Sequence, residues 1–342
     1  AEAVREAPAP PTLPAHRVGP HHDDPLTAYR KANIYPPTSR PLSKDQLDLL
    51  QPNKRHEAMR PTDRDPNVRF LFTADRYFLV GDDTLTATLA VERDGKPLAV
   101  TLTQAYASVV DPKTHQEPRV DVAYAPGAAP GAPLSTVFVP SKLPLKRQAA
   151  ITMLVEFDYG TGKQVAHFDF QYTPSGGVPA RFTGTFSDAL DNGSLVIHAG
   201  VDVISPGHYV IDANLFDADD QPVAWTSFQG ELAAGRQDAA LLFFGKVIVD
   251  GNARGPFHIG QLRGAHYAPG MDPDLEQMPP YPGSFTTQAY TTAQFSDAEY
   301  DSPAKRKMIE LLSSSTHSDG AGHGMPGGES GGETRQPVDD AR

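Results

Sequence analysis

The feature that most constrains the fold is a run of alternating side chains between residues 209 and 215. Val210, Asp212 and Asn214 are interleaved with four residues that can form an apolar face: Tyr209, Ile211, Ala213 and Leu215. Side chains of a β-strand point alternately to its two faces, so a period of two indicates a half-buried strand. This stretch predicts a strand with one face in a core.

The segment that follows, up to residue 262, repeats short apolar runs between turn signals. Residues 217–220 (DADD) favour a turn, and 222–228 form an extended run with Trp225, the chain's single tryptophan, which we expect to be a core anchor. Residues 241–249 (LLFFGKVIV) read as a buried strand with a bulge at Gly245. A last strand is expected at 257–262. Short strands separated by frequent turns are typical of a β-sandwich.

Two stretches, GHYVIDANLFDADDQPVAW and LFFGKVIVDGNARGPFHIGQL, carry a resemblance to known proteins. They resemble the choice-of-anchor type of β-sandwich module in secreted or surface-anchored bacterial proteins. They are also similar to an uncharacterised proteobacterial family, a domain of unknown function, with tandem immunoglobulin-like domains. The resemblance covers roughly residues 180–312. It implies an exported β-protein, and its motifs are turns, so it supplies no catalytic residues.

The sequence predicts an all-β chain with two tandem immunoglobulin-like β-sandwiches, at residues 67–174 and 181–262. In the first, Leu85, Ala87, Leu89 and Val91 alternate with polar or small residues, and Asp94-Gly95 indicates a hairpin. Residues 173–180 (TPSGGVPA) read as the linker between the sandwiches.

The flanks of the two sandwiches are predicted to be short helices and disordered tails. Residues 26–66 form an irregular brace on the first sandwich, with a helix from Pro41 to Leu50 that Ser43 and Gln46 cap. Residues 263–312 form a closing segment. Its expected elements are an edge strand at 285–290, a capping box at 296–299 and a helix at 304–312 with Met308, Leu311 and Leu312 turned inward. Residues 1–25 and 313–342 are expected to be disordered.

Composition narrows the classes of partner and location. The net charge of −12 argues against nucleic-acid binding. Cysteine is absent, which removes disulfides and thiolate chemistry, and no apolar run is long enough for a transmembrane segment. The chain starts Ala1-Glu2-Ala3 and continues into a Pro/Ala tract, as a mature protein does after a signal peptide is removed. We therefore expect an exported protein: periplasmic, cell-surface or secreted.

The candidate metal site is a calcium site in the second sandwich. Asp188 and Asp191 lie in one predicted loop, and Asp217 and Asp219, with Asp220 beside them, lie in another. Loops at one end of a sandwich can together supply the six to eight oxygens that calcium takes. The alternative, which the sequence favours, is that these are turn residues. Residues 21–24 (HHDD) have the donors of a transition-metal site, but a flexible tail provides no bonds to fix such ligands.

The sequence gives less support to catalytic residues for hydrolysis than to a metal site. His198, His208 and His258 lie on or beside predicted strands, and the sequence favours them as face residues. The chain has no G-x-S-x-G or H-E-x-x-H motif, and its Gly-rich segments at 126–131 and 175–177 lack the Lys-Ser/Thr of a phosphate loop.

The sequence therefore predicts no catalytic and no cofactor-binding residues, with calcium as the one possible ligand ion. The expected function is that of a non-catalytic envelope or secreted protein that binds a protein or glycan partner through sandwich loops or edges. Two alternatives stay open. One is an accessory domain or hydrolase acting on the cell wall or a polysaccharide, and the other is a calcium-stabilised adhesin-like module.

Overall fold

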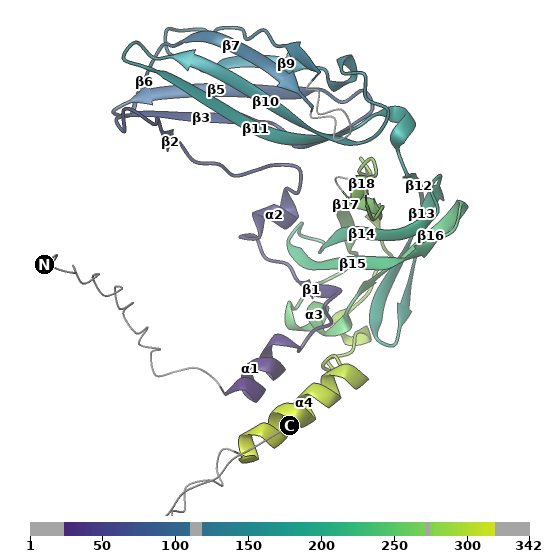
Figure 1. Ribbon diagram of the computed structural model, residues 1–342. Coiled ribbons are helices and arrows are strands. Elements are labelled where there is room, and N and C mark those ends of the chain that lie inside the picture. Colours follow the sequence, from purple (N-terminus) through teal and green to yellow (C-terminus); the bar gives the residue numbers. More distant parts are fainter. Residues whose placement is uncertain (1–23, 110–117, 271–273, 319–342) are drawn as a thin grey trace, which may run out of the picture. The chain divides into compact units, whose positions relative to one another are not determined.

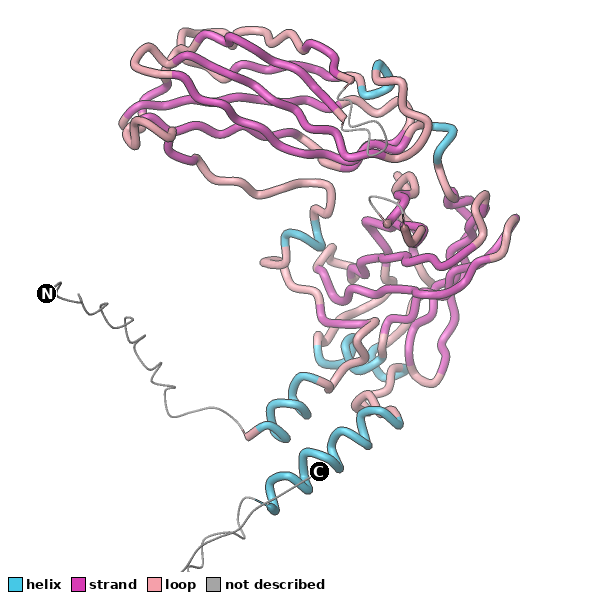
Figure 2. The backbone as a smooth tube through the Cα atoms, viewed as in Figure 1, coloured by secondary structure: helices cyan, strands magenta, loops and turns pink. Residues whose placement is uncertain are grey.

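The computed structural model describes residues 24–109, 118–270 and 274–318. The described part of the chain divides into two compact units, one within residues 35–299 and the other made of residues 24–34 and 300–318. The larger unit contains two β-sandwiches in tandem, each made of two mainly antiparallel sheets (Figures 1 and 2). The predicted all-β fold with two sandwiches and short helices is confirmed.

The first sandwich packs two five-stranded sheets. One has the order β4-β11-β10-β7-β8, and the other has the order β2-β3-β5-β6 with β9 paired to β5. The strands of the first sheet are β4 (Phe78–Val80), β7 (Thr101–Ser108), β8 (Arg119–Asp121), β10 (Ala149–Asp158) and β11 (Lys163–Thr173). Those of the second are β2 (Arg60–Pro61), β3 (Val68–Ala74), β5 (Leu85–Arg93), β6 (Lys96–Pro97) and β9 (Leu134–Phe138).

Alternation and turn chemistry explain this first sandwich. The predicted apolar face of β5 is buried: Leu85, Ala87, Leu89 and Val91 are at most 4% exposed. Asp94 and Gly95 have φ angles of 50° and 75°, as a two-residue hairpin between β5 and β6 requires. The structure adds β9, a strand that follows the Gly/Pro loop and that the sequence pattern did not predict.

The second sandwich packs a sheet of order β1-β15-β14-β17-β18, with β19 also paired to β17, against a sheet of order β12-β13-β16. The strands of the larger sheet are β1 (Ser39–Pro41), β14 (Gly207–Phe216), β15 (Pro222–Leu232), β17 (His258–Tyr267), β18 (Leu275–Gln277) and β19 (Phe285–Thr286). Those of the smaller sheet are β12 (Ala180–Asp191), β13 (Ser194–Val203) and β16 (Gly235–Phe243).

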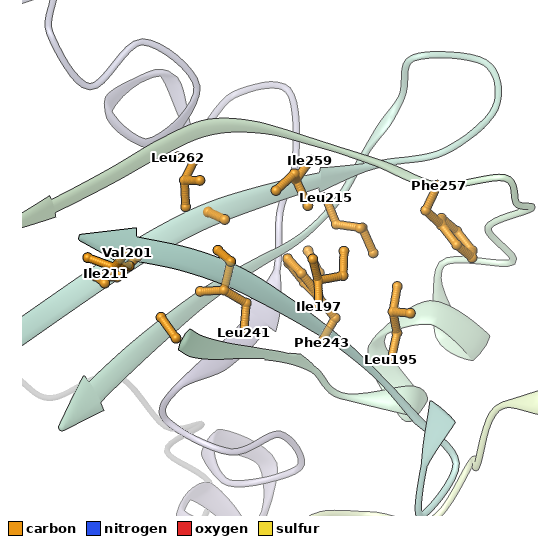
Figure 3. Packing of buried hydrophobic residues seen from close by; sticks show 14 of the residues in the cluster. Leu195, Ile197, Val201, Ile211, Leu215, Leu241, Phe243, Phe257, Ile259 and Leu262 are labelled. Carbon is orange, nitrogen blue, oxygen red and sulfur yellow. The ribbon is translucent and has the colours of Figure 1, made fainter. Parts of the chain in front are cut away.

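The core of the second sandwich lies between these sheets. Tyr209, Ile211, Ala213 and Leu215, the face predicted from alternation, are all 0% exposed. Figure 3 shows Ile211 and Leu215 from β14, Ile197 from β13 and Leu241 from β16 pointing into the same interior. Burial of this aliphatic surface is the main source of stability for the sandwich.

One predicted strand is wrong in its second half. β16 ends at Phe243, and the rest of the apolar run forms the short helix α3 (Gly245–Asp250). Val247 and Ile248 are buried, so the run is apolar because a helix packs on the core there. Periodicity cannot separate a short buried strand from a short buried helix.

The predicted brace differs from the structure in its length and in its partner. Ser43 N donates to Gln46 Oε1 (2.8 Å) as expected of a cap, yet α2 spans Leu47–Leu50 alone. β1 pairs with β15 of the second sandwich rather than with the first. Trp225 also differs from its prediction: it is partly exposed and lies outside the buried core cluster.

The smaller unit contains two helices, α1 (Pro25–Ala32) and α4 (Pro303–Ser318). Asp24, expected in the tail, caps α1 by accepting from the N–H groups of Leu26 and Thr27. Pro303 begins α4, as its position after Ser302 predicts. The predicted inward face of α4 is wrong for two residues, because Met308 is 41% and Leu311 54% exposed. None of the described helices is long and apolar enough to cross a membrane.

Candidate binding pocket

Several connections of the second sandwich lie at one of its ends, the end at which β13 begins. β13 runs away from this end and β14 returns to it, and β15 and β16 repeat the same path. The β12–β13 turn, the β14–β15 turn and α3 therefore lie at the same end. Gly245 N donates to Ser194 Oγ (3.1 Å), and Ala218 N donates to Arg254 O (3.0 Å), which ties these connections together.

A pocket of about 260 Å³ opens at this end, and we call it the end pocket. Its walls combine aliphatic side chains with two carboxylates and a phenol. The lining residues are Tyr35, Pro41, Leu42, Asp217, Gln221, Pro222, Val223, Val247, Asp250, Gly251 and Ala253. A small concave site with apolar walls and a few polar groups has the usual composition of a ligand pocket.

Tyr35 and Asp250 form the polar wall on the α3 side. The Tyr35 hydroxyl donates to Asp250 Oδ2 (2.8 Å), and Lys246 Nζ donates to Oδ1 (3.1 Å) from one helical turn earlier. Burial, reinforced by the neighbouring Asp250 carboxylate, raises the pKa of Tyr35 to about 12. Tyr35 therefore stays a neutral hydrogen-bond donor at physiological pH.

Asp217 is the second carboxylate that lines the pocket. Its Oδ1 accepts from the backbone N–H groups of Asp219 and Gln221, both at 2.9 Å. These bonds close the β14–β15 turn, as expected for an Asp at a turn. The same residue thus shapes the loop and brings a negative charge to the pocket.

The other predicted calcium ligands are bonded elsewhere at the same end. Asp188 Oδ2 accepts from the Tyr290 hydroxyl (2.6 Å) and from Gln288 N (3.2 Å). Burial first, and Asp188 second, raise the pKa of Tyr290 to about 12. Asp191 Oδ1 accepts from Asn192 Nδ2 (3.0 Å).

The loops predicted to hold calcium share an end of the sandwich, yet their carboxylates do not converge. Within residues 24–109, 118–270 and 274–318, no three His, Asp or Glu side chains gather in a group that could hold a metal ion. Calcium binding by Asp188, Asp191, Asp217 and Asp219 stays a prediction. Of the candidate tail site, His21, His22 and Asp23 lie outside the described residues.

The structure keeps the three candidate histidines apart. His198 is exposed on β13. His208, at the start of β14, pairs with Glu231 (3.1 Å), while His258 lies opposite Phe216 at the other end of β14 and contacts Asp220 (3.3 Å). Each therefore has a different environment, and the two carboxylates that contact His208 and His258 are different residues.

Sequence reasoning missed Tyr35 and Asp250 as pocket residues. Asp250 directly follows the run at 241–249 that the sequence predicts to be a strand, and Tyr35 lies in the segment predicted to brace the first sandwich. A second pocket, of about 310 Å³, lies in the first sandwich beneath the loop at 126–132. Its lining is aliphatic and holds no charged residue, so it offers less chemistry than the end pocket.

The fold defines a tandem β-sandwich protein, and three solved structures are similar to it over part of the chain. No family model and no curated protein matches the chain. A DUF4785 family protein from Legionella pneumophila is 18% identical with a TM-score of 0.45, and the match covers 65% of this chain and 58% of that one.

Two further structures are similar at lower TM-scores. Salmonella alpha-2-macroglobulin is 11% identical over 69% of this chain and 15% of its own, with a TM-score of 0.30. The FN1–FN3 domains of chicken CNTN1 are 15% identical over 62% of each chain, with a TM-score of 0.22. The Legionella protein is assigned to a family of unknown function. None of these similarities assigns a function to this chain.

Proposed function

We propose that this chain is an exported envelope or secreted protein whose end pocket binds a basic side chain of a protein partner. The observation that carries the proposal is the pocket itself: two carboxylates, Asp217 and Asp250, and the Tyr35 hydroxyl stand among aliphatic walls. A lysine side chain has the matching form, an ammonium group on a four-carbon stem. The chain's net charge of −12 also favours basic partners.

The two carboxylates have different tasks in this proposal. Lys246 already pairs with Asp250, which offsets one of the two negative charges. Asp217 receives its two backbone N–H bonds on Oδ1 and supplies the second charge. An incoming ammonium group therefore pairs chiefly with Asp217, and the Leu42, Val223 and Val247 side chains contact its stem.

The partner is sought by cross-linked capture from envelope fractions, with a variant that fills the pocket. Gln221 is exposed at the pocket rim, so Gln221→Trp blocks entry with little effect on the core. Gln104→Trp, at an exposed position of the first sandwich, is the matched control. We expect a protein that the wild type and Gln104→Trp capture and Gln221→Trp does not. Equal capture by all three contradicts the proposal.

Location is tested separately. Export is proposed from the sequence resemblance, and fractionation of cells that naturally express the protein checks it. We expect the protein in the periplasm, on the cell surface or in the medium. Recovery in the cytoplasm alone contradicts export but leaves the pocket chemistry standing.

A further inference from the structure

A cluster of polar side chains lies on the outer face of the larger sheet, and none of its members lines the end pocket. We call it the Trp225 cluster: Asp212, Asn214, Trp225, Gln261 and Arg263. Strand register brings Asn214 opposite Trp225, and Asp212 opposite Arg263. Because Ile211, Ala213 and Leu215 face the core, Asp212 and Asn214 face outward.

Polar atoms without a protein partner concentrate here. Among the described residues, six buried side-chain N or O atoms lack a hydrogen-bond partner, and three of them belong to this cluster. They are Asp212 Oδ1, Asn214 Oδ1 and Trp225 Nε1. Asn214 is 0% exposed, and its Nδ2 donates to Leu49 O (2.7 Å) and Gln261 Oε1 (3.1 Å), which fixes its amide orientation. Nearly all buried polar groups in proteins are satisfied, so this concentration requires an explanation.

The backbone of the cluster is also unusual. Gln261 has a φ of 47°, in the left-handed region that residues other than glycine rarely adopt. It lies where the register between β14 and β17 shifts, which is a bulge. Arg263 holds this geometry by donating from Nη1 to Gln261 O (3.1 Å) while its Nη2 pairs with Asp212 Oδ2 (3.3 Å). Such strain and bulges recur beside binding sites.

A short segment, residues 43–52, passes over Asn214, and we call it the α2 strap. Both ends are anchored: before the strap, Leu42 N donates to Val223 O (3.1 Å), and after it, Phe78 N donates to the side-chain Oδ1 of Asn53 (2.6 Å). Between these anchors Leu49 O accepts from Asn214. The strap holds a single four-residue helix, and Leu47 within it is 40% exposed. Segments with so little burial open at low free-energy cost.

We propose that the Trp225 cluster is a sugar-binding site that becomes accessible when the α2 strap moves aside. Sugar hydroxyls both donate and accept, so they satisfy the Asp212 and Asn214 oxygens and the indole N–H together. The indole ring offers an apolar surface to the C–H face of a sugar ring. A metal cation is disfavoured by the Arg263 guanidinium and the indole N–H, and an anion by the Asp212 carboxylate. This site is separate from the end pocket and does not depend on its function.

The single tryptophan makes the test direct, because all tryptophan emission comes from Trp225. The full chain is titrated with glucose, galactose, mannose, N-acetylglucosamine, maltose and chitobiose, with glycerol as a solvent control. We expect at least one sugar to change the emission in a saturable way while glycerol does not. No saturable change with any of the six sugars overturns the proposal, as does an equal change with glycerol.

Two variants locate the binding. Asp212→Asn removes the charged acceptor and keeps the shape, and it should weaken the sugar's affinity about tenfold or more. Asp238→Asn, exposed on β16, is the matched control and should leave affinity unchanged. Circular-dichroism melts confirm that both variants are folded. If Asp212→Asn is misfolded, calorimetry on Trp225→Phe replaces it, and unchanged affinity in the folded variant overturns the assignment.

Strap movement has its own readout. Hydrogen exchange of residues 43–52 should become faster when the sugar is bound, because the bond from Asn214 to Leu49 is lost. Faster exchange confined to this segment supports the proposal. Binding with unchanged or slower exchange in the strap overturns the opening step.

Discussion

His266 and Glu276 form a largely buried hydrogen-bonded pair across β17 and β18, with Nδ1 and Oε2 2.9 Å apart and side chains only 13% and 16% exposed. β18 has three residues, and Glu276 is the one in register with His266. His208 and Glu231 make a similar pair between β14 and β15 (3.1 Å), but there the side chains are 41% and 76% exposed. The same sheet thus contains one His–Glu pair that is largely buried and one that is exposed.

This difference predicts unequal effects of one substitution. Glu276→Gln leaves His266 without its charged partner in a poorly solvated place, so we expect a loss of about 1–3 kcal/mol in the free energy of unfolding. Glu231→Gln, at the exposed pair, should change it by less than about 0.5 kcal/mol. Urea denaturation of both variants measures this. Equal losses in the free energy of unfolding would show that burial of the pair does not change its contribution to stability.

A second prediction concerns the close approach of Gly245 to Gly193. A Cβ at Gly245 would lie 2.0 Å from Gly193 O, which is backbone and cannot move aside. We expect Gly245→Ala to destabilise the chain by about 1–3 kcal/mol through this overlap. Gly176→Ala is the control, because a Cβ there meets nothing within 4 Å, and it should stay within about 0.5 kcal/mol of wild type. Thermal melts compare the two, and an undisturbed Gly245→Ala argues against the α3 packing.

A third prediction is an alkaline loss of stability that Tyr209 contributes. Tyr209 is 0% exposed, its hydroxyl donates to Ser205 O (2.6 Å), and burial raises its pKa from 10.0 to about 12. The folded state therefore holds this proton more tightly than the unfolded state does. Its contribution is complete below pH 10 and is lost as the pH rises toward 12.

The matched variant is Tyr209→Phe. It should be less stable at neutral pH by about 1–2 kcal/mol, because the Ser205 carbonyl loses its buried donor. Its stability should also fall less between pH 10 and 12 than that of the wild type, as measured by denaturant titration at each pH. An identical alkaline decline in both proteins would exclude Tyr209 as the group responsible.

A fourth prediction tests the calcium site. Asp188, Asp191 and Asp217 are engaged by separate hydrogen-bond partners, so we expect the melting temperature to be the same with calcium and with chelator. A ligand that binds only the folded state would raise it. A calcium-dependent rise that Asp217→Asn abolishes would establish the predicted site instead.

Much of the fold could be predicted from the sequence because strand alternation is a local signal. The buried faces of β5 and β14 follow directly from it, and Asp94-Gly95 adopts the positive φ angles that its predicted turn needs. Local signals fail where tertiary packing decides. The apolar run after Phe243 becomes α3 because it closes the end of the core, and β1 joins the second sandwich through long-range pairing with β15.

The candidate sites were harder to predict for the same reason. The end pocket joins Tyr35 to Asp217 and Asp250, residues that are far apart in the sequence and carry no motif. Trp225 was expected in the core because tryptophan buries much apolar area. Its position opposite Asn214 on β14 places it on the outer face instead, which only the register between β14 and β15 reveals.

The most direct test of the central claim is an NMR titration of the end pocket with a lysine-containing peptide and its norleucine counterpart. The account predicts saturable shifts at Tyr35, Gln221 and Val247 with the lysine peptide alone. Asp217→Asn should weaken them, because it keeps the turn but removes the charge, while Asp219→Asn in the same loop should not. Shifts that are equal for both peptides, or that survive Asp217→Asn unchanged, would contradict the proposed role of the pocket.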